Sequence, residues 1–506
     1  MTDAFTALTQ LLTPSVLIYM MVGVLVGFVI GVLPGLSGTM AIAILTPVTF
    51  WLDPADGFGM LIGVWNSAIF AGGVSAILIN TPGTPASFMQ TLDGYALYKQ
   101  GRGGLALGVN VIYSAFGGIL SILALSVFAF PIARFAIKFG PTEYFMLAVF
   151  GLGMMITIAG ENLLKGVVMG VAGMLLATIG LDPMLGTKRF TLGQPQLLNG
   201  ISYIAVMIGM FGIAEVLYQI YTKRHTIDRQ EEQKKDEILK IGRVLPNWKE
   251  VKQLARPTLI SSAIAIVVGA IPAAGGDVAT IIAWGQGRKT SKHPEEYGRG
   301  SLEGLAIASC ANNGVIGGAL TTMLTLGVPG DTISAILIGA LTMYGMTPGV
   351  KMFTENVGFI YKIIWLSLFA NIAFLIFGLL TAKLTARVLK IKSEIVWVLV
   401  CVFCVVGSFA IKNSYMDVLT MFAAAVIGFF CKKYSFPLAP FILGMILSSM
   451  AESNFRRALI LSHGSFSIFF ARPVTVVLMA LVVFIFVRPM AVKFLKKSRA
   501  EKRPGN

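Results

Sequence analysis

Two aspartates, Asp277 and Asp331, stand in stretches of the sequence that otherwise carry no charge. Asp277 follows a Gly-Gly pair, and Asp331 follows a Pro-Gly pair. A carboxylate in an apolar membrane segment is costly, and such groups often bind an ion, carry a proton or face a substrate. Either aspartate could instead cap a helix by accepting a backbone N–H bond. The sequence leaves both roles open, with Na⁺ or H⁺ coupling at Asp277 and Asp331 as the functional hypothesis.

Proline and glycine interrupt the apolar sequence at matching positions in its two halves. The four interrupted stretches are Gly31–Gly38, Asn80–Ser87, Gly269–Gly276 and Gly327–Ser334. Asn66 lies 16 residues before Pro82, and Asn313 lies 16 residues before Pro329. An ordered set of matches of this kind indicates an internal duplication.

A break inside lipid exposes backbone polar groups, which is tolerated only where protein or a water-filled cavity satisfies them. The N-terminus of a half-helix presents free N–H groups to a carboxylate, whereas unwound carbonyls suit Na⁺. Helix packing is the alternative role for glycines, and we prefer it for Gly23 and Gly27, which are spaced by four residues. The predicted substrate-binding residues lie at or near the breaks: Ser37, Gly38, Thr39, Asn66, Pro82, Gly83, Thr84, Ser87, Asn313, Pro329, Gly330, Asp331, Thr332 and Ser334.

The composition indicates which elements carry these residues. Of the 506 residues, 56% are hydrophobic and 13% are charged, whereas soluble proteins carry about 25% charged residues. No charged residue occurs between Asp3 and Asp53, and roughly 20 apolar residues suffice for a spanning helix. We therefore predict an all-α polytopic membrane protein with about eleven or twelve transmembrane helices, plus Gly/Pro-broken re-entrant or discontinuous helices in two repeats.

Charged residues divide the chain and indicate its orientation. A basic linker at 222–256 separates a first repeat half, 1–221, from a second, 257–506, which includes C-terminal helices and a basic tail. The excess of Lys and Arg predicts that the linker and the tail are cytoplasmic, so the net charge of +16 reflects topology rather than binding to nucleic acid.

The loops at equivalent positions differ in charge. The loop with Asp53 and Asp56 is acidic, whereas its counterpart, 288–299, is basic. Opposite charges at equivalent loops favour inverted repeats. An alternative alignment, which matches 98–102 to 297–299, would make the repeats parallel.

Other function classes fit the sequence less well. No Gly-x-x-x-x-Gly-Lys-Ser/Thr loop is present, which argues against an ATP-driven pump. An intramembrane aspartyl protease that uses Asp277 and Asp331 stays open as an alternative, because two close carboxylates can share a proton. An anion channel is a second alternative. A secondary transporter that is not an enzyme fits the repeated breaks best.

Further motifs resemble the large membrane subunit of the tripartite tricarboxylate transporter family. The resemblance covers nearly the whole chain in the right order. Its motifs are Gly31–Gly38, Asn80–Gly83, Asp93-Gly-Tyr95, Gly101-Arg102, Leu181–Gly186, Arg189–Gly193, Phe436–Pro440, Glu452 with Arg456-Arg457, and Arg472-Pro473. The sequence departs from the family at Trp65-Asn66-Ser67, where an aromatic-Gly pair is usual.

The resemblance implies uptake of a tricarboxylate such as citrate, or a related organic acid, across the bacterial inner membrane. It implies a Na⁺ or H⁺ gradient as the driving force. We expect no cofactor, with Na⁺ as a candidate coupling ion. It also implies two protein partners, a small membrane subunit of about four helices and a periplasmic substrate-binding protein.

Overall fold

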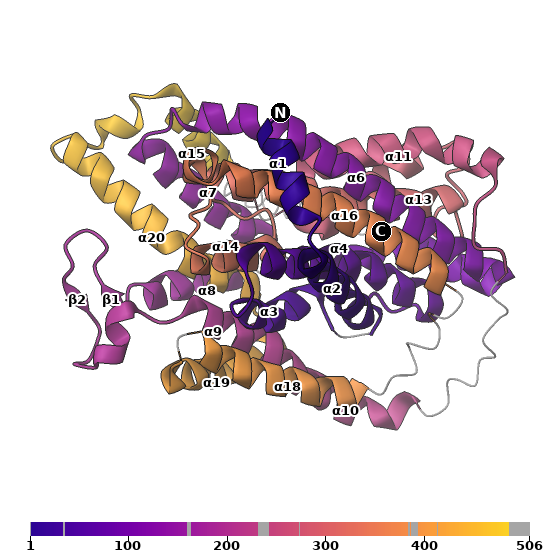
Figure 1. Ribbon diagram of the computed structural model, residues 1–506, viewed down its shortest axis with the longest axis horizontal. Coiled ribbons are helices and arrows are strands. Elements are labelled where there is room, and N and C mark those ends of the chain that lie inside the picture. The colour runs from indigo at the N-terminus through magenta and orange to yellow at the C-terminus, as the bar shows by residue number, and fades with distance from the viewer. Residues whose placement is uncertain are drawn as a thin grey trace, which may run out of the picture. The chain divides into compact units, whose positions relative to one another are not determined.

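The computed structural model describes residues 2–33, 36–158, 163–230, 242–272, 274–382, 385, 393–411 and 413–484. Most of these residues are helical, in agreement with the all-α prediction (Figure 1). One small antiparallel hairpin pairs β1 (Gly180–Leu181) with β2 (Lys188–Arg189). Pro34 and Gly35 of the first break, residues 231–241 of the predicted linker and the basic C-terminal tail lie outside the described residues.

Eight described helical segments are long and apolar enough to cross a membrane, so the chain is a multi-pass membrane protein. They are Pro14–Val32, Pro54–Ile79, Pro85–Ala136, Tyr203–Thr222, Trp248–Gly269, Val357–Thr381, Tyr415–Lys433 and Leu438–Leu461. Five shorter apolar helices accompany them: Gly38–Thr49, Leu163–Ala177, Thr332–Met343, Glu394–Ala410 and Pro473–Phe484. Two of these, Gly38–Thr49 and Thr332–Met343, directly follow predicted breaks.

The chain forms two compact units. The first comprises Met1–Arg134 with Ile204–Lys433, and the second comprises Phe135–Tyr203 with Tyr434–Asn506. In the second unit, α20 (Leu438–Leu461) packs on α7 (Pro141–Ile158) and α8 (Leu163–Ala177). This division follows contacts in space, whereas the division at 222–256 follows the repeat in the sequence.

The first unit contains the repeated helices in the same order twice. The first copy consists of α2 (Pro14–Val32), α3 (Gly38–Thr49), α4 (Pro54–Ile79), η1 (Pro85–Ser87), α5 (Phe88–Leu97) and α6 (Gly103–Ala136). The second consists of α11 (Trp248–Gly269), α12 (Gly275–Thr290), α13 (Leu302–Leu326), α14 (Thr332–Met343), α15 (Val350–Glu355) and α16 (Val357–Thr381). The remaining described helices of this unit are α1 (Thr2–Leu11), η2 (Tyr98–Arg102), α9 (Tyr203–Met207), η4 (Ile208–Ile213), α10 (Ala214–Gln230), α18 (Ser393–Ala410) and α19 (Tyr415–Lys433).

Small residues bring the first and third helices of each copy into close contact. A Cβ added to Gly27 would lie 2.6 Å from the carbonyl oxygen of Val64, so α2 and α4 touch through their backbones, as the packing interpretation predicts. The second copy repeats this contact, because α11 packs on α13 (Figure 1) and a Cβ on Gly269 would lie 2.9 Å from Val315 Cα.

The equivalent helices α4 and α13 run in opposite directions where they cross. Asn313 Nδ2 donates to the Asn66 carbonyl at 2.9 Å, and Asn312 Nδ2 donates to the Ile69 carbonyl at 3.1 Å. At this crossing, higher residue numbers on α4 therefore lie beside lower residue numbers on α13. Gly94 also packs against both the end of α4 and the start of α13. Antiparallel equivalent helices are what an inverted repeat requires, and the parallel alignment does not produce them.

Candidate functional site

The second break of the first half folds back into the protein. Asn80 adopts a left-handed conformation (φ 54°) and ends α4. The chain then reverses, and Gly83 N donates to the carbonyl of Gly72 at 3.1 Å, two turns before the end of α4. A Cβ on Gly83 would lie 2.8 Å from Gly72 Cα, so a side chain has no room there. From this interior position η1 begins and runs directly into α5.

The second half repeats this reversal. Gly327 is left-handed (φ 69°) and ends α13. A Cβ on Gly330 would lie 2.6 Å from Ala319 Cα, so this glycine returns to a level about two turns before the end of α13. Gly330 is the counterpart of Gly83, and α14 begins from an interior position as α5 does. The matched spacing of Pro82 and Pro329 therefore corresponds to matched backbone geometry.

Four helix N-termini converge in the first unit. A Cβ on Gly38, at the start of α3, would lie 3.5 Å from Ile333 Cδ1 at the start of α14. A Cβ on Gly276, at the start of α12, would lie 2.9 Å from the Cβ of Ala86 in η1. One on Gly275 would lie 3.9 Å from Asp331 Cβ. The first break of each half thus meets the second break of the other half.

The N-terminus of a helix carries partial positive charge and unpaired N–H groups, so this convergence favours an anion. The serines here serve the helix ends. Ser37 Oγ accepts from Met40 N at 3.1 Å, Ser87 Oγ accepts from Thr84 N at 3.2 Å, and Ser334 Oγ accepts from Asp331 N at 2.9 Å. These three hydroxyls hold the local backbone in shape.

The predicted threonines differ from the serines. The hydroxyls of Thr39, Thr84 and Thr332 have no hydrogen-bond partner among the described residues, and Thr84 Oγ1 is fully buried. A buried hydroxyl without a partner is costly unless water or a ligand satisfies it. All three threonines lie at the starts of converging helices, namely α3, η1 and α14.

The two predicted acids flank the same glycine. A Cβ on Gly275 would lie 3.6 Å from Asp277 Oδ1 and 3.9 Å from Asp331 Cβ. Asp277 is exposed and Asp331 is half-buried, and neither forms an ion pair within the described parts of the chain. Asp331 Oδ1 accepts from Ser334 N at 2.7 Å, which is the capping geometry that the sequence left open. Two neighbouring carboxylates without a basic partner favour a cation or a proton between them.

The predicted asparagines lie deeper, where α4 and α13 cross. Asn66 Nδ2 donates to the Ile62 carbonyl at 2.9 Å, and its Oδ1 accepts from Asn371 Nδ2 at 2.9 Å. Asn66 is thus fixed by partners from its own helix and from α16. Asn313 keeps one side-chain oxygen without a partner, as does Asn371. Asn371 was missed by the sequence analysis, although an amide in the long uncharged run of α16 is a visible signal.

Asp93 was quoted from the sequence only as part of a motif, and the structure gives it a specific role. Its carboxylate is completely buried in α5. It accepts from Trp284 Nε1 at 2.8 Å, from Gly298 N at 2.8 Å and from Ser301 N at 2.9 Å. These bonds fasten the half-helix α5 to α12 and to the loop between α12 and α13, so Asp93 positions one of the four converging helices.

In the second unit, motif residues from distant parts of the chain form one charged cluster. Arg189 contacts both Asp182 and Glu452, and Arg456 Nη1 lies 2.7 Å from Asp182 Oδ2. The backbone N–H of Leu185 and these two arginines hold the pKa of Asp182 well below its usual range. The cluster fastens the β1–β2 hairpin to α20.

Comparison with known families identifies the chain's relatives. The model of the tripartite tricarboxylate transporter TctA family matches residues 17–443. The chain belongs to this family. It is therefore a subunit of a tripartite tricarboxylate transporter, a class of membrane transport protein whose members act with partner subunits.

Two relatives from Agrobacterium vitis carry descriptive names only. The "Uncharacterized 52.8 kDa protein in TAR-I ttuC' 3'region" is 33% identical over 472 residues, which cover 93% of this chain and 92% of the relative. The "Uncharacterized protein in TAR-II ttuC' 3'region" is 28% identical over 215 residues, or 42% of this chain and 89% of the relative. No solved structure matches this chain.

Proposed function

We propose that this subunit imports a tricarboxylate such as citrate, or a related organic acid, across the bacterial inner membrane. The observation that carries the proposal is the convergence of the N-termini of α3, η1–α5, α12 and α14. Each N-terminus contributes partial positive charge, which suits a substrate with several carboxylates. The hydroxyls of Thr39, Thr84 and Thr332 would bind substrate oxygens, and Ser37, Ser87 and Ser334 would keep the helix ends in shape.

The same site would couple uptake to a cation gradient. Asp277 and Asp331 lie beside the converging helix ends, where their negative charges oppose the binding of a carboxylate substrate. A Na⁺ ion or a proton between them removes that opposition, so the cation and the substrate bind better together than either does alone. Positive coupling of this kind is what a symporter requires. It also gives the two acids a role other than the proton-sharing pair of a protease.

Two protein partners complete the proposed system: a periplasmic binding protein that delivers the substrate and a small membrane subunit of about four helices. Family membership supports the need for partner subunits. The excess of Lys and Arg supports a cytoplasmic linker and C-terminal tail. The loop that ends at Asp53, with Asp56 in the first turn of α4, would then face the periplasm. The basic loop after α12, with the last turn of that helix, would face the cytoplasm. Labelling of single cysteines from outside intact cells tests this orientation, because equal labelling of both loops contradicts it.

Transport in proteoliposomes tests the proposed function. The purified complex, with its binding protein present, is given labelled carboxylates under an imposed Na⁺ gradient or an imposed H⁺ gradient. We expect uptake that saturates with substrate and requires one of the two gradients. Uptake that does not saturate and ignores both gradients would support an anion channel instead.

A further inference from the structure

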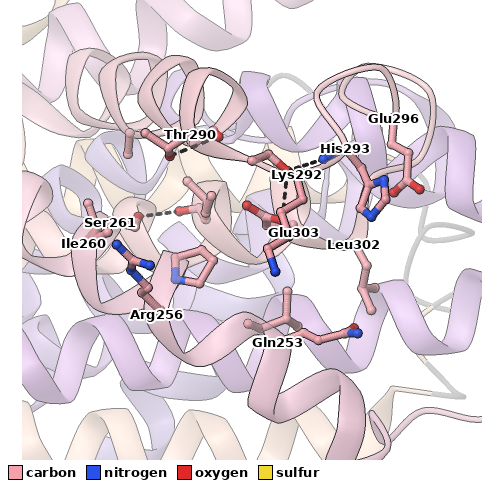
Figure 2. A pocket seen from close by; sticks show the side chains of 16 residues that line it. Gln253, Arg256, Ile260, Ser261, Thr290, Lys292, His293, Glu296, Leu302 and Glu303 are labelled. Carbon is pink, nitrogen blue, oxygen red and sulfur yellow. Dashed lines mark hydrogen bonds between the residues drawn. The ribbon is translucent and has the colours of Figure 1, made fainter.

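A cavity of about 660 Å³ lies among α11, α12 and α13, and no residue of the proposed substrate site lines it (Figure 2). Its wall consists of residues from the three helices and from the loop after α12: Gln253, Leu254, Arg256, Pro257, Ile260, Ser261, Ala283, Gly287, Thr290, Ser291, Lys292, His293, Glu296, Leu302, Glu303 and Ile307. The cavity is thus separate from the proposed substrate site.

The wall of the cavity combines buried apolar residues with exposed basic ones. Ala283 and Ile307 are buried. Arg256 and Lys292, which Figure 2 labels, are exposed side chains. Neither of these two cations has an ion pair or a hydrogen bond to another described residue. Two acids, Glu296 and Glu303, also line the cavity. Glu303 accepts from Ser291 Oγ at 3.1 Å and from Tyr297 OH at 3.0 Å.

The basic residues of the cavity wall lie where the surface of the helices changes from charged to apolar. On α11 the charged residues end at Arg256, and the outer face continues with Leu259 (53% exposed) and Ile260 (42%). On α12 the exposed Ile281 and Ile282 precede the basic residues of its last turn. Exposed aliphatic faces on spanning helices suit contact with lipid chains. The cavity therefore extends across the boundary between the headgroup region and the hydrocarbon region.

We propose that this cavity binds an anionic phospholipid, with Arg256 and Lys292 as ligands of its phosphate. Basic pockets between transmembrane helices are suited to anionic headgroups. The ammonium and guanidinium groups supply charge-assisted hydrogen bonds, and the aliphatic surface at Ile260 accommodates the start of an acyl chain. A small soluble anion would use the cations but not the apolar surface, so the combination selects a lipid.

Thermal unfolding of the purified full-length protein in detergent tests this site. Phosphatidylglycerol and phosphatidylcholine are titrated separately, and inorganic phosphate forms a third arm. We expect phosphatidylglycerol to raise the unfolding midpoint in a saturable way and the other two to have little effect. In the Arg256→Gln/Lys292→Gln variant the apparent affinity for phosphatidylglycerol should fall roughly 25-fold, since each basic side chain contributes a factor of about five.

The matched control is Lys252→Gln/Lys289→Gln, which removes the same charge from α11 and from the last turn of α12, at residues that do not line the cavity. This control should keep wild-type affinity. Native mass spectrometry provides a second measurement, in which wild-type and control protein retain a phosphatidylglycerol adduct that the cavity variant loses. Equal effects of the two lipids, equal losses in the two variants, or full stabilisation by inorganic phosphate alone would each overturn the proposal.

Discussion

Asp331→Asn separates the two roles of this side chain. In the structure Asp331 Oδ1 accepts from Ser334 N at 2.7 Å and so caps α14. Asparagine keeps a side-chain oxygen at the same place, and Asn and Asp cap helices about equally. We therefore expect the free energy of unfolding to change by less than about 0.5 kcal/mol. Asp331→Ala, which removes the cap, should cost about 1 kcal/mol.

The effect on transport should be much larger if the carboxylate binds the coupling cation. Asp331 has no basic partner among the described residues, so its charge is available to a cation beside Gly275. A charge-assisted interaction contributes about 1.5–3 kcal/mol, which corresponds to roughly a 10- to 150-fold change in affinity. Asp331→Asn should raise the concentration of Na⁺ needed for half-maximal uptake by that factor. If the coupling ion is H⁺, the Asp331→Asn substitution should abolish the dependence of uptake on pH.

The assay compares uptake rates in proteoliposomes over a series of Na⁺ concentrations and pH values, for wild type and Asp331→Asn at equal protein incorporation. Thermal unfolding of the same preparations checks that capping is retained. Wild-type rate and ion dependence in the Asn variant would refute the ligand role and leave Asp331 as a helix cap.

Three further predictions concern the support of the site and the second unit. Asp93→Asn should lower the free energy of unfolding by about 2–3 kcal/mol and slow uptake, because a buried carboxylate with several donors is lost; equal thermal stability would contradict this. Gly27→Ala should lower the unfolding temperature, since the added Cβ would lie 2.6 Å from the Val64 carbonyl oxygen, whereas Gly285→Ala meets no atom within 4 Å and should not. Because the pKa of Asp182 is lowered in the folded protein, the stabilising effect of its carboxylate is fully present above the usual Asp pKa of about 3.9 and is lost as the pH falls below that value. Hydrogen exchange at Leu185, corrected for intrinsic rate, should therefore accelerate only below about pH 4.

The repeat was predictable because proline and glycine leave a strong local signal. A reversal of the backbone needs positions such as Gly83 and Gly330, where no side chain fits, and these residues can be read directly from the sequence. The opposite charges of equivalent loops predicted inversion, and the antiparallel crossing of α4 and α13 agrees with it.

Contacts between distant residues could not be predicted in the same way. The bond between Asp93 and Trp284 joins two copies of the repeat, and no local pattern states which donor a buried carboxylate will find. The charged cluster of the second unit likewise needs Asp182 and Arg456 to meet across most of the sequence. The sequence also does not specify the backbone geometry that decides which hydroxyls cap a helix, as the serines do, and which have no partner, as with the threonines.

The central claim is that half-helices from both repeats form one carboxylate site. Protection of engineered cysteines by the substrate tests this claim most directly. Thr39→Cys and Thr332→Cys, one in each repeat and both half-buried, are made separately after the four native cysteines are replaced, and Thr290→Cys at the end of α12 serves as the control. Modification by a maleimide is timed at increasing concentrations of a transported tricarboxylate. The account predicts that the substrate slows modification at Thr39→Cys and Thr332→Cys with one shared half-maximal concentration, and leaves Thr290→Cys unaffected. Protection at only one of the two positions, or at neither, would contradict it.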